Sequence, residues 1–452
     1  MRPPVEKNDI IELTIHGLGS EGQGVGRVDG YAVFLPGALP GELARAQVIK
    51  VTSGYCVARL LEVLSPSQDR VDGGCPAYPR CGGCTLRHLS YAGQLAAKTR
   101  QVKEALERLG GFEAPPVLPA IGMESPCRYR NKGSFPFGPD GEGRAEIGFF
   151  ARRSDRLVPL EDCPIQDERI VTVARIVRDW ARKYGVQPYD EAGRKGLLRH
   201  VMARASAHGV LGLVVSAGPL PHKAELVDAL RAGVDGLTGV VHNLNRADTN
   251  VILGPEYTTL WGEDRLRVDM CGAELWVSMP SFLQVNPIQA EALYGAAIDM
   301  LGLTGRERVA DVYCGIGSIS LLLARRAGDV IGIEVVEEAV SDARLNTERN
   351  GIANARFIAG EAEAVLPALL RDGLKLDAAV IDPPRKGCDE AALHALAASG
   401  ADRIAYVSCN PATLARDCRI LSGLGYRLVK AQPVDMFPHT NHIECAALLT
   451  KS

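Results

Sequence analysis

The sequence predicts an α/β protein in three parts: an amino-terminal β-barrel, a β-rich middle, and a carboxy-terminal doubly wound parallel sheet. From residue 276 onward, buried-strand runs alternate with helical segments, as in a parallel sheet covered by helices. Residues 9–65 hold five short strand signals separated by glycine- and proline-rich turns. A chain of 452 residues is also too long for one hydrophobic core. We therefore expect domains at 1–65, 66–275 and 276–452.

The barrel signal favours an OB-like module, and an SH3-like barrel without a nucleic-acid role is the alternative. A helix is predicted over 90–110, because apolar residues recur there at near-helical spacing and Gly110-Gly111 ends the pattern. From about 125 to 275 the signals are mostly short strands, with helices near 167–184 and 222–232.

Charge is distributed unevenly along the chain. The formal net charge is −3, which alone argues against a nucleic-acid partner. Residues 66–200, however, carry 22 Lys and Arg against 17 Asp and Glu. A basic segment with interleaved aromatic residues suits single-stranded RNA if its cations share one face of a strand, and a solvated charged face is the alternative. It consists of Arg128, Tyr129, Arg130, Lys132 and Phe135.

The composition is that of an ordinary globular protein, with 46% apolar and 23% charged residues. The polar first residues do not predict a signal peptide, and no run reaches the roughly 18 apolar residues of a membrane span. We therefore expect a cytoplasmic protein without a membrane partner, in which the 12 cysteines form no disulfide framework.

A glycine turn in the carboxy-terminal part predicts a cofactor loop. The strand signal 308–313 runs into Cys314-Gly315-Ile316-Gly317, and the next strand ends in Glu334. Glycines let the backbone approach a ligand closely, and an acid at a strand tip can accept ribose hydroxyls. Position 320 is Ser rather than a third glycine, which disfavours NAD relative to S-adenosylmethionine.

Two further loops follow strand signals in this part. Asp382-Pro383-Pro384-Arg385 is an acidic loop that two prolines make rigid, and Cys409 follows the apolar run 404–407. The carboxyl ends of parallel strands share one edge, so a cofactor, an acid and a thiol should meet there. A thiolate that adds to carbon 6 of uracil makes carbon 5 nucleophilic toward a methyl donor, which makes Cys409 a candidate nucleophile. A buried strand-end thiol is the alternative.

The same reaction requires a base that removes the carbon-5 proton. Glu444 is the candidate, because a glutamate that enters the apolar run 446–449 is costly unless it has a partner or a function. We expect this run to form an edge strand. His442 is a rival base, although a hydrogen-bonding role is the simpler interpretation for it.

A cysteine set in the middle part predicts a metal site. Cys75, Cys81 and Cys84 are closely spaced among glycines. We choose Cys163 over Cys127 as the fourth ligand, because Cys163 and Cys75 each precede a proline. Four thiolates can hold a [4Fe–4S] cluster or a structural zinc ion, and the unpaired spacing favours the cluster.

Together these motifs resemble the uracil-5 RNA methyltransferases that carry an amino-terminal TRAM domain. The resemblance covers nearly the whole chain and rests on the glycine-rich barrel and the cysteine set as well as on five shorter motifs. These are Phe282-Leu283-Gln284-Val285-Asn286, Asp311-x-Tyr313-Cys314-Gly315, Asp382-Pro383-Pro384-Arg385, Ser408-Cys409-Asn410-Pro411 and His442-Ile443-Glu444.

The resemblance implies a class I Rossmann-like methyltransferase domain behind a TRAM barrel and a central iron–sulfur domain. It assigns Cys409 as nucleophile, Glu444 as base and Cys75, Cys81, Cys84 and Cys163 as ligands of a [4Fe–4S] cluster. S-adenosylmethionine would be bound by Gln284, Tyr313, Gly315, Glu334 and Asp382. Ser318 replaces an Asn of some relatives, and helix 90–110 would pack on the catalytic domain.

The resemblance also implies that a chain with this barrel and cluster acts on 23S rRNA rather than tRNA, and we expect a monomer. The alternatives are the same chemistry on tRNA, and a non-catalytic RNA-binding ribosome assembly factor that keeps the fold. An NAD-dependent iron–sulfur oxidoreductase is a third alternative. The missing third glycine and the Asp-Pro-Pro-Arg loop disfavour it.

Overall fold

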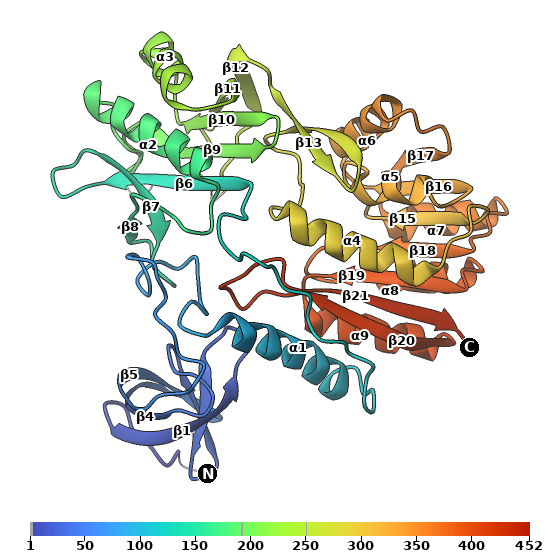
Figure 1. Ribbon diagram of the computed structural model, residues 1–452, viewed down its shortest axis with the longest axis horizontal. Helices are drawn as coiled ribbons and strands as arrows, with labels where there is room; N and C mark the ends of the chain where they lie inside the picture. Colours follow the sequence, from blue (N-terminus) through green and yellow to red (C-terminus); the bar gives the residue numbers. More distant parts are fainter. Residues whose placement is uncertain (1–2, 191–192, 250) are drawn as a thin grey trace.

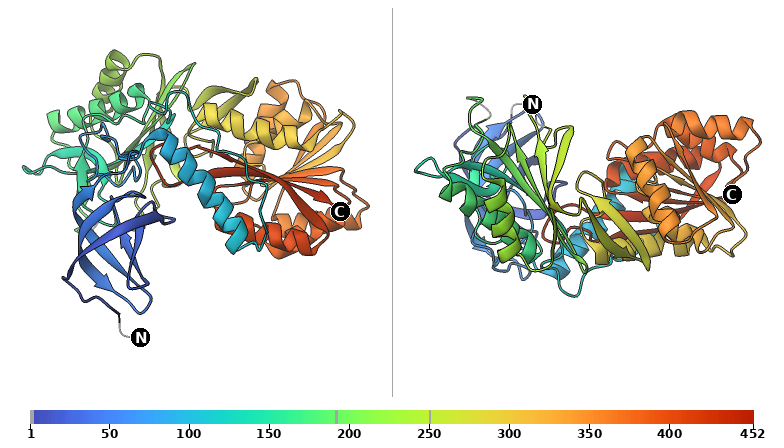
Figure 2. Two further views of the ribbon diagram at one scale, coloured as in Figure 1. Left: turned by 60° about the horizontal axis from the view of Figure 1, so that its bottom comes forward. Right: turned by 90° about the horizontal axis from the view of Figure 1, so that it is seen from above.

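Figure 1 shows the computed structural model, which describes residues 3–190, 193–249 and 251–452. The barrel and the two large sheets occupy separate parts of an elongated molecule, and helix α1 connects them (Figure 2). Within the described ranges, no helix combines the length and the apolar character that crossing a bilayer requires.

The predicted five-stranded barrel is confirmed. Its strands close in the order β1-β2-β3-β5-β4 around a small apolar core. At Gly26 a Cβ atom would lie 2.7 Å from both Leu13 and the backbone oxygen of Thr14, so only glycine fits between the strands. The strands are β1 (Ile10–Leu18), β2 (Gly24–Val28), β3 (Tyr31–Leu35), β4 (Leu43–Val51) and β5 (Tyr55–Ser65).

Helix α1 (Tyr91–Arg108) begins where the Ser90 hydroxyl accepts a hydrogen bond from the amide of Gly93. Its buried face includes Val102 and Leu106, and the helix packs against α9 (Pro411–Gly423) of the carboxy-terminal sheet. Helix α1 thus precedes the middle part of the chain in sequence but packs on the carboxy-terminal part (Figure 1).

The middle of the chain forms a seven-stranded sheet in the order β12-β11-β10-β9-β6-β7-β8. Helices α2 (Glu168–Lys183) and α3 (Lys223–Gly233) pack together on one face of it. The strands are β6 (Lys132–Pro139), β7 (Ala145–Phe150), β8 (Leu157–Pro159), β9 (Leu198–Ser206), β10 (Gly209–Ser216), β11 (Leu237–Leu244) and β12 (Glu256–Gly262).

The predicted basic strand face at 128–132 is wrong. Strand β6 begins only at Lys132, because the amides of Arg128 and Arg130 are hydrogen-bonded to the backbone oxygens of Pro164 and Ile165. Arg128 adopts a positive φ of 51° and forms an ion pair with Asp162, so the cations do not line one face.

The carboxy-terminal sheet confirms the predicted doubly wound α/β architecture. Its order is β17-β16-β15-β18-β19-β21-β20, in which the first five strands run parallel. Strands such as β18 are wholly buried, as expected when helices cover both faces. The strands are β15 (Arg308–Val312), β16 (Asp329–Glu334), β17 (Ala355–Ala359), β18 (Ala378–Ile381), β19 (Arg403–Ser408), β20 (Tyr426–Val434) and β21 (Glu444–Lys451).

The expectation that the run containing Glu444 forms an edge strand is wrong. Strand β21 lies between β19 and β20 and runs antiparallel to both. Both of its edges are therefore paired within the sheet. The helices of this part are α4 (Pro287–Leu301), α5 (Ser318–Ala324), α6 (Glu337–Arg349), α7 (Ala362–Arg371) and α8 (Glu390–Ala398), followed by α9.

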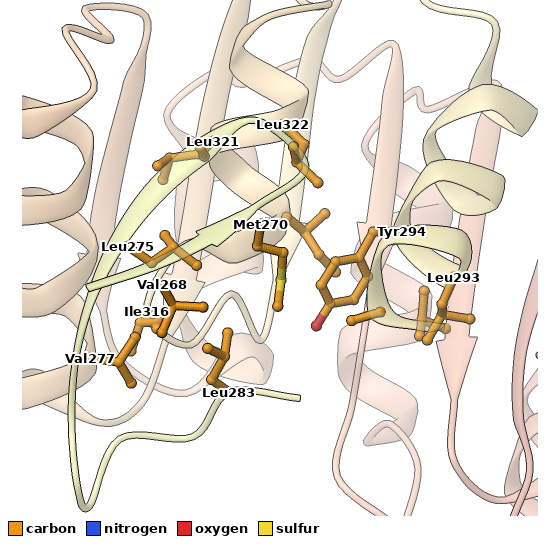
Figure 3. Packing of buried hydrophobic residues seen from close by; sticks show 14 of the residues in the cluster. Val268, Met270, Leu275, Val277, Leu283, Leu293, Tyr294, Ile316, Leu321 and Leu322 are labelled. Atoms are coloured by element: carbon orange, nitrogen blue, oxygen red, sulfur yellow. The ribbon is translucent and has the colours of Figure 1, made fainter. Parts of the chain in front are cut away.

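A hairpin of β13 (Arg265–Met270) and β14 (Ala273–Ser278) lies between the two large sheets, where β13 contacts β9 and β10 and β14 contacts α5 and α6. Figure 3 shows Met270 and Leu275 of the hairpin packed against Leu321 and Leu322 of α5, next to Tyr294 of α4. The hairpin spans residue 275, where the boundary between the second and third domains is predicted. The division into three domains stays a prediction.

Candidate active site

The register of the carboxy-terminal sheet brings the predicted site residues to one edge. Val312 of β15 is the partner of Ile333 in β16 and of Ile381 in β18, and Ile381 is the partner of Tyr406 in β19. Tyr313, Asp382 and Cys409 directly follow β15, β18 and β19, and Glu334 is the last residue of β16. They therefore lie in neighbouring rows at the carboxyl edge of the sheet, where open α/β sheets bind their ligands.

The loop after β15 is held by Glu334. Its two carboxylate oxygens accept hydrogen bonds from the amides of Gly315 (3.1 Å) and Val336 (2.9 Å). Tyr313 and Gly315 have positive φ values of 68° and 54°. A Cβ atom at Gly315 would meet no atom within 4 Å, so this turn opens onto free space. These features suit a ligand that approaches the backbone closely.

Two carboxyl groups lie next to this loop, those of the fully buried Asp311 and of the half-buried Asp382. Ser320 donates a hydrogen bond of 2.5 Å to Asp311, and burial raises the pKa of Asp311 to about 7. Burial, together with the nearby Asp311 carboxylate, also raises the pKa of Asp382 to about 7. Close carboxylates cannot all ionise easily, so this edge of the sheet holds a proton near neutral pH.

The acidic loop and the thiol loop are bonded to each other. The Asn410 side chain donates to the backbone oxygen of Arg385 (3.1 Å) and accepts from the amide of Ala412 (3.0 Å), which caps α9. Asn410 therefore fixes Cys409 beside the Asp-Pro-Pro-Arg loop. Burial raises the pKa of both Cys409 and Glu444, and the Arg385 guanidinium partly opposes this rise.

Glu444 begins β21, and Cys409 directly follows the neighbouring strand β19. Ser408 is the partner of Cys445 in the antiparallel β19–β21 pair, so the next residues outward are Cys409 and Glu444. Cys409 is partly exposed and Glu444 is 3% exposed. Burial and the neighbouring Glu444 raise the pKa of the Cys409 thiol, and burial and Asp382 raise the pKa of Glu444 well above its usual value.

Tyr294 of α4 is a site residue that the sequence did not reveal. It is 3% exposed, and the Gln284 side chain lies beside its hydroxyl. Burial, then Asp382 and Glu444, raise the pKa of Tyr294, which places its hydroxyl among these acids. In sequence it resembles any core residue of an apolar helix.

Gln284 itself lies in a buried turn before α4, where Asn286 caps the helix by accepting from the Gln289 amide. Two residues earlier, Phe282 exposes 71% of its surface. His442 is also exposed. Its ring packs edge-on against Phe437, and partial burial, Arg385, Lys98 and Arg130 lower its pKa.

The four predicted cysteine ligands line one cavity of about 350 Å³ in the middle of the molecule. Burial raises the pKa of Cys84 to about 12, Arg87 opposes this shift, and Cys163 and Cys81 add to it. The lining residues include Cys163 but not Cys127, which is exposed. In residues 3–190, 193–249 and 251–452, however, no group of three or more His, Cys, Asp or Glu side chains is arranged to hold a metal ion.

Comparisons with known proteins agree with this architecture. Residues 262–452 match the family described as tRNA (Uracil-5-)-methyltransferase, and residues 4–61 match the TRAM domain. An uncharacterized RNA methyltransferase of Halalkalibacterium halodurans is 46% identical over 99% of this chain and 98% of that protein. An uncharacterized RNA methyltransferase of Clostridium tetani is 44% identical over 99% of this chain and 97% of that protein.

A solved structure shows the same fold over almost the entire chain. It is the Pyrococcus abyssi tRNA (uracil-54, C5)-methyltransferase in complex with S-adenosyl-L-homocysteine. The TM-score is 0.77 at 26% identity, covering 97% of this chain and 99% of that one. The chain therefore belongs to the TRAM-domain RNA methyltransferases of the tRNA (uracil-5-)-methyltransferase family, and it is an S-adenosylmethionine-dependent enzyme.

Proposed function

We propose that this enzyme methylates carbon 5 of a uridine in RNA through a covalent bond between Cys409 and carbon 6 of the base. The observation that carries the proposal is the adjacency of Cys409 and Glu444 at the ends of paired strands, at the edge where the cofactor loop opens. Asp382 and Arg385 lie beside both groups. A nucleophile, a base and a donor site are the parts that this reaction requires.

The steps follow from the chemistry of these groups. The Cys409 thiolate bonds to carbon 6, and the electron pair of the carbon 5–carbon 6 double bond moves onto carbon 5 and the adjacent carbonyl. Carbon 5 then takes the methyl group, while the electron pair of the broken sulfur–carbon bond would stay on the sulfur of the donor. The Glu444 carboxylate removes the carbon-5 proton. The double bond forms again and expels the thiolate. Arg385 favours the ionised form of both groups, because its charge lowers their pKa values.

The methyl donor site is proposed to comprise Gln284, Tyr313, Gly315, Glu334 and Asp382. S-adenosylmethionine supplies an electrophilic methyl group when it is bound. The open space at Gly315 suits it, as does the Glu334 carboxylate, which is fixed at a strand tip by two backbone amides. Ser318 begins α5 directly after this turn, and we assign it no contact.

We propose 23S rRNA as the substrate and a monomer as the active form. The flipped uridine would enter beside Phe282, whose exposed ring offers a stacking surface. A tRNA substrate is the second candidate, because the matched Pyrococcus abyssi enzyme is named for a tRNA uracil. The test is to map 5-methyluridine in rRNA and tRNA from cells with and without the protein. Loss from 23S rRNA supports the first assignment, and loss from tRNA alone contradicts it.

We further propose that Cys75, Cys81, Cys84 and Cys163 hold a [4Fe–4S] cluster. Four sulfur donors share one cavity, and its lining in the described chain includes Arg87, Arg130 and Lys132 but no Asp or Glu. The Arg87 guanidinium carries positive charge into this space: Arg87 is 7% exposed, and its Nη1 atom has no hydrogen-bond partner. Such surroundings suit an anionic thiolate centre. Zinc is the alternative metal, and iron and sulfide analysis of the purified protein distinguishes the two.

The direct test of the activity uses purified enzyme, methyl-labelled S-adenosylmethionine and transcripts of the two RNAs. The expected product, identified by mass spectrometry of nucleosides, is 5-methyluridine. Label found only on ribose or on a ring nitrogen would contradict the proposal. RNA binding without any methyl transfer would instead favour a non-catalytic assembly factor.

A further inference from the structure

The loop that leads into Glu444 makes contacts with every other part of the molecule. Residues 435–443 connect β20 to β21, and we call them the Glu444 loop. In Figure 1 this loop extends from the carboxy-terminal sheet towards the beginning of α1 and the segment that follows the barrel. Its contacts come from α1, from the cysteine segment and from the barrel, as described below.

Helix α1 anchors the first half of the loop. Lys98 is 1% exposed and forms a 2.5 Å ion pair with Asp435, which is fully buried. The same ammonium group donates to the backbone oxygen of Phe437 (3.0 Å). One turn earlier, the Gln94 side chain accepts a hydrogen bond from the His439 amide (2.8 Å). The loop is thus fixed to α1 before it reaches the cysteine segment.

The cysteine segment anchors the second half of the loop. The amides of Thr85 and Leu86, which directly follow Cys84, both donate to the backbone oxygen of His439 (3.0 and 2.9 Å). The Thr85 hydroxyl accepts from the Asn441 amide (2.9 Å) and donates to the Asn441 side-chain oxygen (3.1 Å). One hydroxyl can do both, since it has one donor and two acceptor sites.

Asn441 also reaches the barrel. Its side-chain nitrogen donates to the backbone oxygen of Ser20 (2.7 Å), in the turn between β1 and β2. In that turn, a Cβ atom at Gly22 would lie 3.3 Å from Asn441 and 3.4 Å from the Thr85 hydroxyl, and Gly22 has a φ of 76°. The barrel, the cysteine segment and the Glu444 loop therefore meet at one closely packed point, three residues before Glu444.

We propose that Thr85 and Asn441 are positioning residues for Glu444, and that they couple the cysteine segment and the barrel to proton removal. The inference rests on the proposed role of Glu444. Glu444 is the first residue of β21, so the path of the preceding loop determines where its side chain enters the site. Cys409 lies on a different loop that Asn410 and Arg385 hold, so adduct formation does not depend on this junction.

The test compares Thr85→Val with wild-type enzyme on a transcript of the RNA in which the mapping experiment locates the 5-methyluridine. Valine keeps the shape of threonine but removes both hydroxyl bonds to Asn441. We expect the covalent adduct to form at the wild-type rate and to resolve about tenfold more slowly, the order expected for one or two net hydrogen bonds. The adduct should then accumulate on a denaturing gel during turnover, with kcat reduced and KM unchanged.

Two variants serve as controls. Thr85→Ser keeps the hydroxyl and should restore resolution. Thr99→Val removes a hydroxyl of the same kind, which donates to the Leu95 carbonyl (2.8 Å) and accepts from the Ala120 amide (2.9 Å), neither of which belongs to the Glu444 loop. It should leave resolution unchanged.

The possible results separate this inference from the proposed function. If wild-type enzyme never forms a bond to RNA, the proposed function fails. If wild-type enzyme forms and resolves the adduct and Thr85→Val resolves it equally fast, only the positioning role is overturned. An equal slowing by Thr99→Val would also overturn it, because the effect would then be a general loss of packing.

Discussion

The carboxyl edge of the carboxy-terminal sheet, which we call the catalytic edge, and the cysteine cavity are assembled in different ways. At the catalytic edge, residues far apart in sequence meet because four parallel strands end in the same place. In the cysteine cavity, no sheet fixes the register. Three ligand candidates lie in the turn-rich segment 75–84, and the fourth follows β8. The edge should therefore tolerate loss of a functional side chain, whereas the cavity should depend on what binds its thiols.

The largest effect is expected at Cys409. Cys409→Ala should reduce methyl transfer to the detection limit, because the sulfur proposed to bond to carbon 6 is then missing. The free energy of unfolding and the RNA affinity should remain near the wild-type values, since Cys409 is partly exposed at a strand end. Methyl transfer and RNA binding, measured side by side, check this. Full activity of the variant would refute the role of Cys409.

Glu444→Gln should be nearly as severe but should stop the reaction later. Loss of a general base typically costs about 10²- to 10⁴-fold in rate. The adduct should form and persist, because its carbon-5 proton is no longer removed. A denaturing gel that shows no protein–RNA band with this variant would contradict the assignment.

The cavity should respond in the opposite manner to the edge. Cys81→Ser should lower iron content and the melting temperature together, because metal binding at such sites contributes folding free energy. Cys127→Ser is the matched control, since Cys127 is exposed and does not line the cavity. Unchanged iron content in the Cys81 variant would remove the basis for the cluster.

The smallest effect should be a shift in pH dependence. Burial raises the pKa of Cys409 and Glu444, and both must be ionised to act, so the rate should rise with pH. Arg385 opposes these shifts, so Arg385→Gln should move the rising limb of the pH–rate profile to higher pH. At a fixed pH on that limb, the rate should fall roughly tenfold for each unit by which the pKa rises. Arg385→Lys should keep the limb near its wild-type position, and Lys386→Gln should not move it. A profile of Arg385→Gln that matches wild type would contradict this electrostatic account.

The same contrast explains what could be predicted from sequence. Short motifs after buried strands were sufficient to predict that Tyr313, Asp382 and Cys409 meet, because parallel strands leave little choice of arrangement. Tyr294 was missed because a tyrosine in an apolar helix carries no signal of its neighbours. The contacts of Asn441 with Thr85 and Ser20 were missed because they join loops that no periodicity relates.

Two errors have clear physical causes. The basic segment at 128–132 was expected to alternate as a strand, but pairing with residues 164–165 holds Arg128 at a positive φ. The apolar run that Glu444 enters was expected to form an edge strand. Instead β21 enters between β19 and β20, which places Glu444 beside Cys409.

The central claim is a transient bond between the Cys409 sulfur and carbon 6 of uracil. An RNA transcript that contains 5-fluorouridine should trap it, because fluorine on carbon 5 cannot leave as a proton. Mass spectrometry of the digested complex should then find the nucleotide attached to the peptide that contains Cys409. Absence of an adduct, or attachment to another side chain, would contradict the account.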